Sequence, residues 1–187
     1  MLARRRKALG AVVQWQNFCF PSRQRGFDSR QPLHMTTETI DAYWQRVRDE
    51  IPGLPAETPE AWAFGATPEH ADGLLELVLS GVKTATASSV WDYEASDERM
   101  PQVGDLSVIL DGAGAPRAVI RTVAVEIVPF LEVTTEHAHA EGEGDRTLAA
   151  WRDIHERFWR EHSENPRGWA PDMPVLCERF TLVHPTG

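Results

Sequence analysis

The apolar residues of this chain change their spacing near residue 84, and this change restricts the folds that the chain can adopt. Two segments before that point, residues 36–51 and 67–81, carry apolar residues at helical spacing. After it come β-branched runs separated by Gly, Asp and Pro, as is typical of strands: residues 84–90, 106–110, 117–128 and 175–184. A further amphipathic helix is expected over residues 148–162. This order predicts an α+β fold in which four or five strands form a small, strongly bent sheet or barrel flanked by helices.

The second predicted helix has a clear signal at each end. Thr67 is a capping residue and Pro68 suits the first helical position, where its missing N–H costs nothing. Gly81 follows the last apolar residue and is predicted as the C-terminal cap. For the first helix, we expect Thr36 or Thr37 to be the cap.

The size and composition predict one soluble globular domain, or one domain with a tail, since the 187 residues are 42% hydrophobic and 25% charged. No uninterrupted apolar run reaches the roughly 18 residues that a membrane-spanning helix needs. The two cysteines, Cys19 and Cys177, lie far apart and predict neither a zinc site nor a disulfide framework. These features favour a reducing compartment, and we expect a cytoplasmic protein.

Basic and acidic residues are divided unequally along the chain. Residues 1–34 contain seven basic residues and one acidic residue, a net charge of +6, whereas the rest contains 12 basic and 27 acidic residues, a net charge of −15. We therefore separate a basic tail, residues 1–34, which we expect to be disordered, from a folded domain, residues 35–187. Three interpretations of the tail stay open: upstream sequence translated before a natural start at Met35, an organelle leader, or a functional basic arm.

Lysine is rare in this sequence. The chain has 17 arginines and two lysines, and only Lys83 lies in the predicted domain. An amine, unlike a guanidinium group, can lose its proton when it is buried, as general-base chemistry requires. Lys83 is therefore a candidate functional residue, with compositional drift as the alternative explanation.

Hydroxyl-bearing residues follow Lys83 at the start of the predicted strand, in the sequence Gly81-Val82-Lys83-Thr84-Ala85-Thr86-Ala87-Ser88-Ser89. Within a strand, Lys83 and Thr86 would point to opposite faces, so they can line one cleft only if a turn or a bulge separates them. The alternative is a Thr- and Ser-rich edge strand with a solvated lysine.

A second candidate is the run His137-x-His139-x-Glu141-x-Glu143, which alternates residues that can bind metals. The two histidines lack the i, i+4 spacing of a helical zinc site, and no cysteine joins the run. We expect no metal and no cofactor, and a solvated acidic segment is the simpler interpretation of the run.

Four motifs, in order along the chain, resemble the ASCH domain family, and most closely its branch of small bacterial proteins. They are Gly81-Val82-Lys83-Thr84-Ala85-Thr86, Trp91-Asp92-Tyr93-Glu94, Val103-Gly104-Asp105 and Ala140-Glu141-Gly142-Glu143-Gly144-Asp145-Arg146-Thr147-Leu148. The resemblance covers residues 36–184 and implies a PUA-like small β-barrel, of five strands or so, flanked by helices around a cleft for RNA or a nucleoside. The wider family's pattern Gly-x-Lys-x-x-Glu-x-Arg is only partly present, because Thr86 and Ser88 replace its acid and its arginine.

A bacterial acetylcytidine amidohydrolase of the same family implies a catalytic set of a lysine, a threonine three residues later and a downstream glutamate. These positions fall on Lys83, Thr86 and Glu143. In the implied reaction Thr86 attacks an amide carbonyl, deprotonated Lys83 takes its proton, and Glu143 orients the lysine or relays the proton. A neighbouring Glu143 opposes the loss of that proton, so a structural ion pair that shapes the cleft is the alternative.

Six further residues are candidates for substrate binding. Trp91 and Tyr93 can stack on a base or belong to the core, and Arg146 can hold a phosphate or help to start a helix. The other three candidates are Thr84, Ser88 and Glu141. Five large side chains are assigned to packing alone: Trp62, Trp151, Phe158, Trp159 and Phe180.

Three functions fit these features: hydrolysis of an amide on a modified nucleoside, RNA binding without catalysis, and ribonuclease activity in the same cleft. The net charge of −15 after residue 34 opposes extended phosphate contacts and favours a nucleoside-sized ligand. We therefore expect a nucleoside or a short RNA as the partner and no membrane, while the choice between a hydrolase and a binding module stays open.

Overall fold

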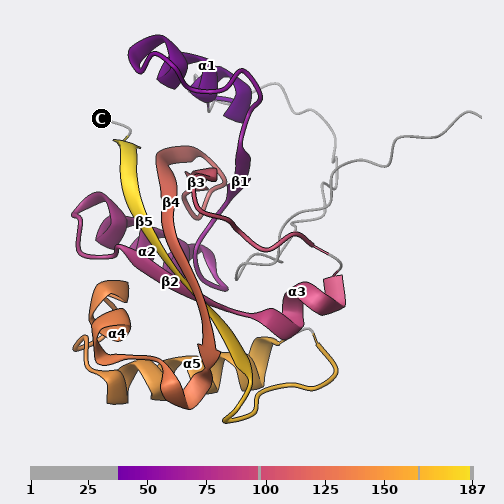
Figure 1. Ribbon diagram of the computed structural model, residues 1–187. Helices are drawn as coiled ribbons and strands as arrows, with labels where there is room; N and C mark the ends of the chain where they lie inside the picture. The colour runs from indigo at the N-terminus through magenta and orange to yellow at the C-terminus, as the bar shows by residue number, and fades with distance from the viewer. Residues whose placement is uncertain (1–37, 97, 164, 186–187) are drawn as a thin grey trace, which may run out of the picture.

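The computed structural model describes residues 38–96, 98–163 and 165–185 (Figure 1). In this part the strands are β1 (Glu60–Trp62), β2 (Ala85–Ser89), β3 (Leu106–Leu110), β4 (Pro116–Pro129) and β5 (Pro174–Pro185). The helices are α1 (Ile40–Glu50), α2 (Pro68–Leu79), α3 (Val90–Ser96), α4 (Thr135–Glu141) and α5 (Leu148–His162), with one 3-10 turn, η1 (Phe130–Glu132). None of these helices is both long and apolar enough to cross a membrane. The predicted tail, residues 1–34, lies outside the described residues.

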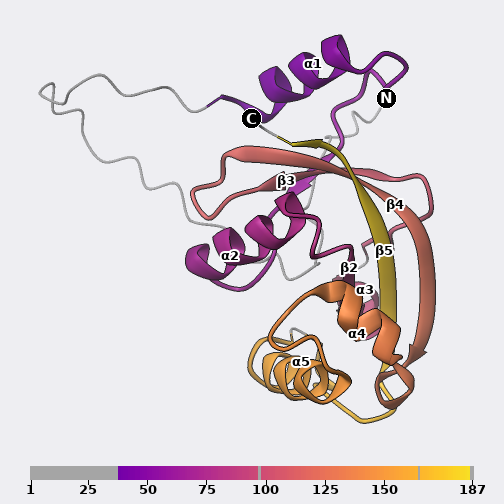
Figure 2. The same ribbon diagram turned by 90° about the vertical axis from the view of Figure 1, so that its left-hand side faces the viewer.

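The strands of the described part form one sheet in the order β1-β3-β4-β5-β2. The long strands β4 and β5 pair antiparallel along its centre, and β1 pairs parallel with β3 at one edge. Register shifts interrupt the β4–β5 ladder between Val119 and Ile120 and between Thr122 and Ala124, and such bulges bend a strand. Figures 1 and 2 show the two strands curving from α1 at one end of the sheet to α4 and α5 at the other. The predicted α+β class with a strongly bent sheet is therefore confirmed.

Helices cover the sheet in three places. α2 belongs to the cluster of Trp62, Phe64, Leu74, Leu75, Val78, Ile109, Ala118, Ile120 and Phe180. α4 and α5 belong to the cluster of Ala87, Phe130, Val133, Ala138, Trp151, Trp159, Met173, Val175 and Cys177. α1 packs Tyr43, Trp44 and Val47 on Val108 and Val119. The residues assigned to packing belong to the first two clusters or, as Phe158 does, pack against the second.

The predicted signals at the ends of α2 are confirmed. Thr67 accepts a hydrogen bond from the His70 amide at 3.2 Å. Gly81 adopts a left-handed φ of 72°, and directly after it the Lys83 amide donates to the Leu77 carbonyl at 2.9 Å. This turn fixes the backbone of Lys83 against the end of α2. The cap of α1 differs from the prediction, since Thr39, rather than Thr36 or Thr37, accepts from the Ala42 amide.

Three short elements were not predicted. No strand was predicted at β1, and the strand predicted over residues 84–90 ends at Ser89, since Val90 begins α3. α4 replaces the segment interpreted as solvated and acidic, and that interpretation is wrong because α4 buries His137 and Glu141. A strand of three residues and helices of seven residues contain too few positions to establish alternation or a helical period in the sequence.

Candidate functional site

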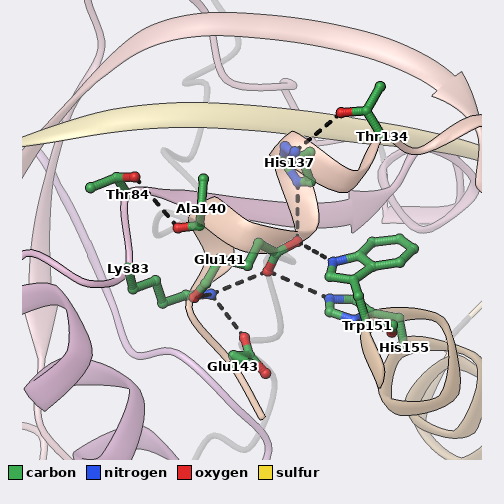
Figure 3. A network of polar contacts seen from close by, with 9 residues as sticks. All are labelled: Lys83, Thr84, Thr134, His137, Ala140, Glu141, Glu143, Trp151 and His155. Carbon is green, nitrogen blue, oxygen red and sulfur yellow. Dashed lines mark hydrogen bonds and ion pairs between the residues drawn. The ribbon is translucent and has the colours of Figure 1, made fainter. Parts of the chain in front are cut away.

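Lys83 is buried directly after the turn that ends α2. Its side chain is 1% exposed, although removing an ammonium group from water is costly unless it is paired. The amine lies 5.4 Å from the centre of the Phe64 ring and points toward the C-terminal end of α4 (Figure 3). Lys83 is therefore not the solvated lysine of an edge strand.

Two carboxylates hold the amine. Lys83 Nζ donates to Glu143 Oε1 at 2.8 Å and to Glu141 Oε2 at 3.2 Å, and it lies 3.4 Å from the Glu141 carbonyl oxygen. Burial lowers the pKa of Lys83, but the attraction of Glu143 and Glu141 outweighs burial, so the pKa is raised above its ordinary value. Lys83 is consequently an ammonium group at neutral pH.

Glu141 is the centre of this cluster. Its side chain is 1% exposed, and Oε1 accepts hydrogen bonds from Trp151 Nε1 at 2.6 Å and from His137 Nε2 at 3.1 Å. Burial alone would raise the pKa of Glu141, but Lys83 and the surrounding donors hold it well below its ordinary value. Glu141, a predicted substrate-binding residue, thus lies in the interior as the partner that positions Lys83.

His155 closes the far side of the cluster (Figure 3). Its Nδ1 donates to the Trp151 carbonyl at 2.9 Å, which directs Nε2 toward Glu141 Oε2 at 3.5 Å. The imidazole stacks on the Trp151 ring with 4.1 Å between the ring centroids. α5 therefore supplies both an indole donor and an oriented histidine to the carboxylate that holds Lys83.

Glu143 forms the outer end of the cluster, with a side chain that is 11% exposed. It follows Gly142, whose left-handed φ of 77° ends α4. A Cβ atom on Gly142 would lie 2.8 Å from Val82 Cγ1 and 3.0 Å from the Val82 carbonyl oxygen, so only glycine allows this approach. The Thr84 amide also donates to the Ala140 carbonyl at 2.8 Å, which fastens the end of α4 to the Lys83 segment.

Thr86 occupies the second position of β2 and is 5% exposed. Its register partner on β5 is Glu178. Because strand residues alternate, Thr86 faces away from its neighbour Ala87, which packs in the cluster beneath α5. Among the described residues, no hydrogen bond joins Thr86 to Lys83, Glu141 or Glu143. The structure thus gathers Lys83, Glu141 and Glu143 and leaves Thr86 on the strand beside them.

The other predicted substrate-binding residues lie around β2 and α4. Thr84 Oγ1 donates to the Ala140 carbonyl at 3.4 Å, and the Ser88 and Tyr93 hydroxyls lie 3.5 Å apart.

Two of the predicted residues have partners near the surface. The Arg167 guanidinium lies 5.3 Å from the centre of the half-buried Trp91 ring. Arg146 adopts a left-handed φ of 65°, and its Nε donates to the His139 carbonyl at 3.0 Å. A ligand that stacks on Trp91 must therefore displace or share the guanidinium of Arg167.

Glu178 is a buried acid that the sequence analysis missed. Its side chain is 2% exposed, and its Oε1 accepts a hydrogen bond from Thr122 Oγ1 at 2.5 Å. The sequence contains a signal for Glu178, because a glutamate inside the β-branched run of residues 175–184 is expected either on a solvent-exposed face or in a functional site.

The described residues contain neither a cluster arranged to hold a metal ion nor a reactive thiol. Over residues 38–96, 98–163 and 165–185, no group of three or more His, Cys, Asp or Glu side chains is arranged to hold a metal ion. His137 and Glu141 bond to each other, while His139 contacts Arg146. Burial, together with Glu141, raises the pKa of the Cys177 thiol to about 12, so Cys177 is no nucleophile at neutral pH.

A groove of about 1040 Å³ lies elsewhere, between the start of α1, the segment around β1 and the loop before β3. Its walls include Asp41, Glu57, Glu60 and Asp105, with Arg99 as a basic residue. None of the predicted site residues lines this groove. The volume of this groove therefore does not support ligand binding at the Lys83 cluster.

Comparisons with known proteins agree with this fold. The sequence model of the ASCH domain matches residues 60–184. An ASCH domain structure from Lactobacillus crispatus JV V101 is 27% identical and covers 81% of this chain and 99% of its own, with a TM-score of 0.70. A structure from Enterococcus faecalis V583, described as family DUF984, is 38% identical and covers 77% of this chain and 87% of its own, also with a TM-score of 0.70. No curated protein matches.

This chain belongs to the ASCH domain family. The predicted resemblance is confirmed, and with it the α+β, PUA-like fold, in which a five-stranded curled sheet in the described part is flanked by helices.

Proposed function

We propose that this protein binds a nucleoside or a short RNA in a cleft between its sheet and its helices, and that it hydrolyses an amide bond on a modified nucleoside. Thr86, Lys83 and Glu143 are the catalytic residues of this proposal. The observation that carries it is the burial of Lys83, 1% exposed, beside Glu143, which reaches the surface. A buried, charged cluster costs desolvation energy, and groups with perturbed pKa values concentrate at functional sites.

The raised pKa of Lys83 decides the role that the proposal gives it. Lys83 acts as a positive charge that stabilises the oxyanion formed when Thr86 Oγ1 attacks the carbonyl carbon. Glu143, 2.8 Å from the amine, keeps the ammonium group oriented and relays a proton to the leaving nitrogen. The role of deprotonated Lys83 as a base, which the resemblance implied, stays a prediction that the raised pKa does not favour.

The charge of the chain supports a small ligand. Residues after position 34 carry a net charge of −15, and each phosphate contact of an extended RNA needs a cation. A nucleoside has no phosphate, so it meets no such requirement. The proposal assigns the base to half-buried Trp91, since Tyr93 is 2% exposed and packs in a core cluster with Val90 and Leu176.

A panel of modified nucleosides, with acetylated cytidine among them, tests the proposal on the full chain. We expect release of the free amine by the wild-type protein and loss of release in Thr86→Val. Lys83→Arg should also lose release, because a larger planar guanidinium keeps the charge but does not fit the enclosed position of the amine. Arg46→Lys, on the exposed face of α1, is the matched control for a change between basic side chains. Full turnover by Thr86→Val, or no turnover of any nucleoside, contradicts the hydrolase.

RNA binding is measured in parallel, as a function of salt concentration. We expect weak binding of single-stranded RNA that falls steeply with salt. Strong binding that persists at high salt, without turnover of nucleosides, would favour an RNA-binding module. Cleavage of the RNA that Lys83→Arg abolishes would favour a ribonuclease.

A further inference from the structure

We infer that Glu178 is the general base that takes the proton from Thr86. The inference rests on the proposed hydrolysis and names the residue that this reaction still lacks. It follows from the register of β2 and β5, from the burial of both side chains and from the charge state of Lys83.

The register places the two side chains on one face of the sheet. Thr86 pairs directly with Glu178, and the β2–β5 ladder runs from Ala85 to Ser89 without a shift. Directly opposed residues of antiparallel strands share a face, with Cβ atoms about 4.5–5.5 Å apart. A carboxylate at that separation can reach the hydroxyl of a threonine. The adjacent pair, Ala87 and Cys177, packs on the other face beneath α5.

Both side chains are buried on the face that they share. Thr86 is 5% exposed and Glu178 is 2% exposed, and Thr122 donates its hydroxyl hydrogen to Glu178 Oε1. Ser88 lies on the same face of β2, and its hydroxyl contacts that of Tyr93. Burying a carboxylate beside hydroxyl groups costs stability without improving the packing of an apolar core. A carboxylate that acts as a general base must lie next to the nucleophile whose proton it takes.

The Lys83 cluster cannot supply the base in the same way. Lys83 already holds its proton, because Glu143 and Glu141 raise its pKa. Both of these carboxylates are engaged with the ammonium group, at 2.8 Å and 3.2 Å. Glu178 is the acid directly opposite Thr86 on the neighbouring strand.

The proton follows a closed path. Glu178 takes the proton of Thr86 Oγ1 as this oxygen bonds to the carbonyl carbon. The C–N bond then breaks, Glu178 gives up this proton, Glu143 relays it to the leaving nitrogen, and an ester remains on Thr86. Water attacks the ester while Glu178 takes a proton from it, and this proton returns to Thr86 Oγ1 as the acid leaves. The sum is one amide and one water converted to one carboxylic acid and one amine.

Acylation of Thr86 by acetylated cytidine, followed by rapid quenching and peptide mass spectrometry on the full chain, tests the inference. We expect an acetyl ester on Thr86 in the wild-type protein. Glu178→Gln should lower the rate of acylation and kcat by about 10²–10⁴-fold, the usual contribution of a general base, with KM little changed. Glu126→Gln is the control, since Glu126 is an exposed acid on β4 that faces the opposite side of the sheet, as the partner of Cys177.

The outcomes separate this inference from the proposed function. A wild-type protein that forms no ester and releases no cytidine contradicts the hydrolase and the base together. Turnover by the wild type that Glu178→Gln retains in full overturns the base alone and leaves the hydrolase.

A second variant covers the case in which Glu178→Gln fails to fold. Thr122→Val removes the hydrogen bond that favours ionised Glu178, so the acid limb of the kcat/KM profile should move to higher pH. An acid limb at the wild-type position would overturn the inference, because a merely structural Thr122 would change stability and not this profile.

Discussion

Two regions at opposite ends of the sheet contain ion pairs of different kinds (Figures 1 and 2). On α1, Arg46 pairs with Glu38 at 3.0 Å, and both side chains are 37% exposed. At the end of α4, Lys83 and Glu141 are each 1% exposed. Water screens the first pair, whereas protein surrounds the second.

The comparison shows that burial, rather than the residue types, decides what an ion pair does. The α1 pair can be broken with little effect, because each side chain regains water. Glu141 has no such alternative, since Lys83, His137, Trp151 and His155 enclose it. Each member of the buried cluster therefore depends on the others, and the cluster fixes the positions of α4 and α5.

Glu141→Leu should have the largest effect. It leaves the Lys83 ammonium with Glu143 alone and removes the acceptor of Trp151 Nε1 and His137 Nε2. Breaking one side of a buried ion pair costs about 3–5 kcal/mol of the free energy of unfolding, which denaturant titration measures. The control is Glu136→Leu on the same helix, whose side chain is 87% exposed. Equal stability of the two variants would contradict the claim that the buried Glu141 carboxylate stabilises the fold more than an exposed one.

Gly142→Ala should follow. The left-handed φ of 77° costs about 1–2 kcal/mol for alanine. The close approach to Val82 should add about 1–3 kcal/mol, as overpacking does. Gly114→Ala isolates the first contribution, because Gly114 has a φ of 81° and no atom within 4 Å of its added Cβ. Thermal unfolding of both variants measures the difference, and equal losses would refute the role of Val82.

Acid should weaken the buried cluster. The pKa of Glu141 is held below its ordinary value, so its contribution to stability is complete above the unfolded pKa of 4.5 and is lost as the pH falls through the lower, folded pKa. The groups that face it are Lys83, His137 and His155. We expect the gap in unfolding free energy between the wild type and Glu141→Leu to stay constant down to about pH 4.5 and then to shrink. A gap that grows on acidification would contradict the low pKa.

Arg46→Ala should have the smallest effect. Its ion pair with Glu38 is exposed to solvent, and such pairs contribute about 0–1 kcal/mol. The loss should decrease further at 1 M salt, where the screening length is about 3 Å. Denaturant titration at low and high salt measures this, and a loss as large as that of Glu141→Leu would remove the distinction between the two regions.

The sequence was sufficient for the parts of the fold that repeat a pattern over many residues. α2 and α5 each contain enough positions for a helical face, and the caps Thr67 and Gly81 mark the ends of α2. The long strands β4 and β5 were predicted from β-branched runs. β1, α3 and α4 were not predicted, because three residues are too few to show the alternation of a strand and seven are too few to show the period of a helix.

The candidate site was only partly predictable for a different reason. Lys83 was found from composition, and Glu143 from the resemblance to the family. The enclosure of Glu141 depends on Trp151 and His155, which reach it only because α5 packs beside α4. Glu178 became a candidate only when the register of β2 and β5 placed it opposite Thr86. Both relations join residues that are distant in sequence, and no local spacing encodes them.

The burial of Lys83 has a consequence for how the folded state can be observed. It is the single lysine after residue 34, and the end of α4, 58 residues further along the chain, must be in place to cover it. Amine-reactive reagents can modify Lys83 only when α4 moves away. The rate at which the peptide containing Lys83 is labelled therefore reports the local opening of this helix without any engineered probe.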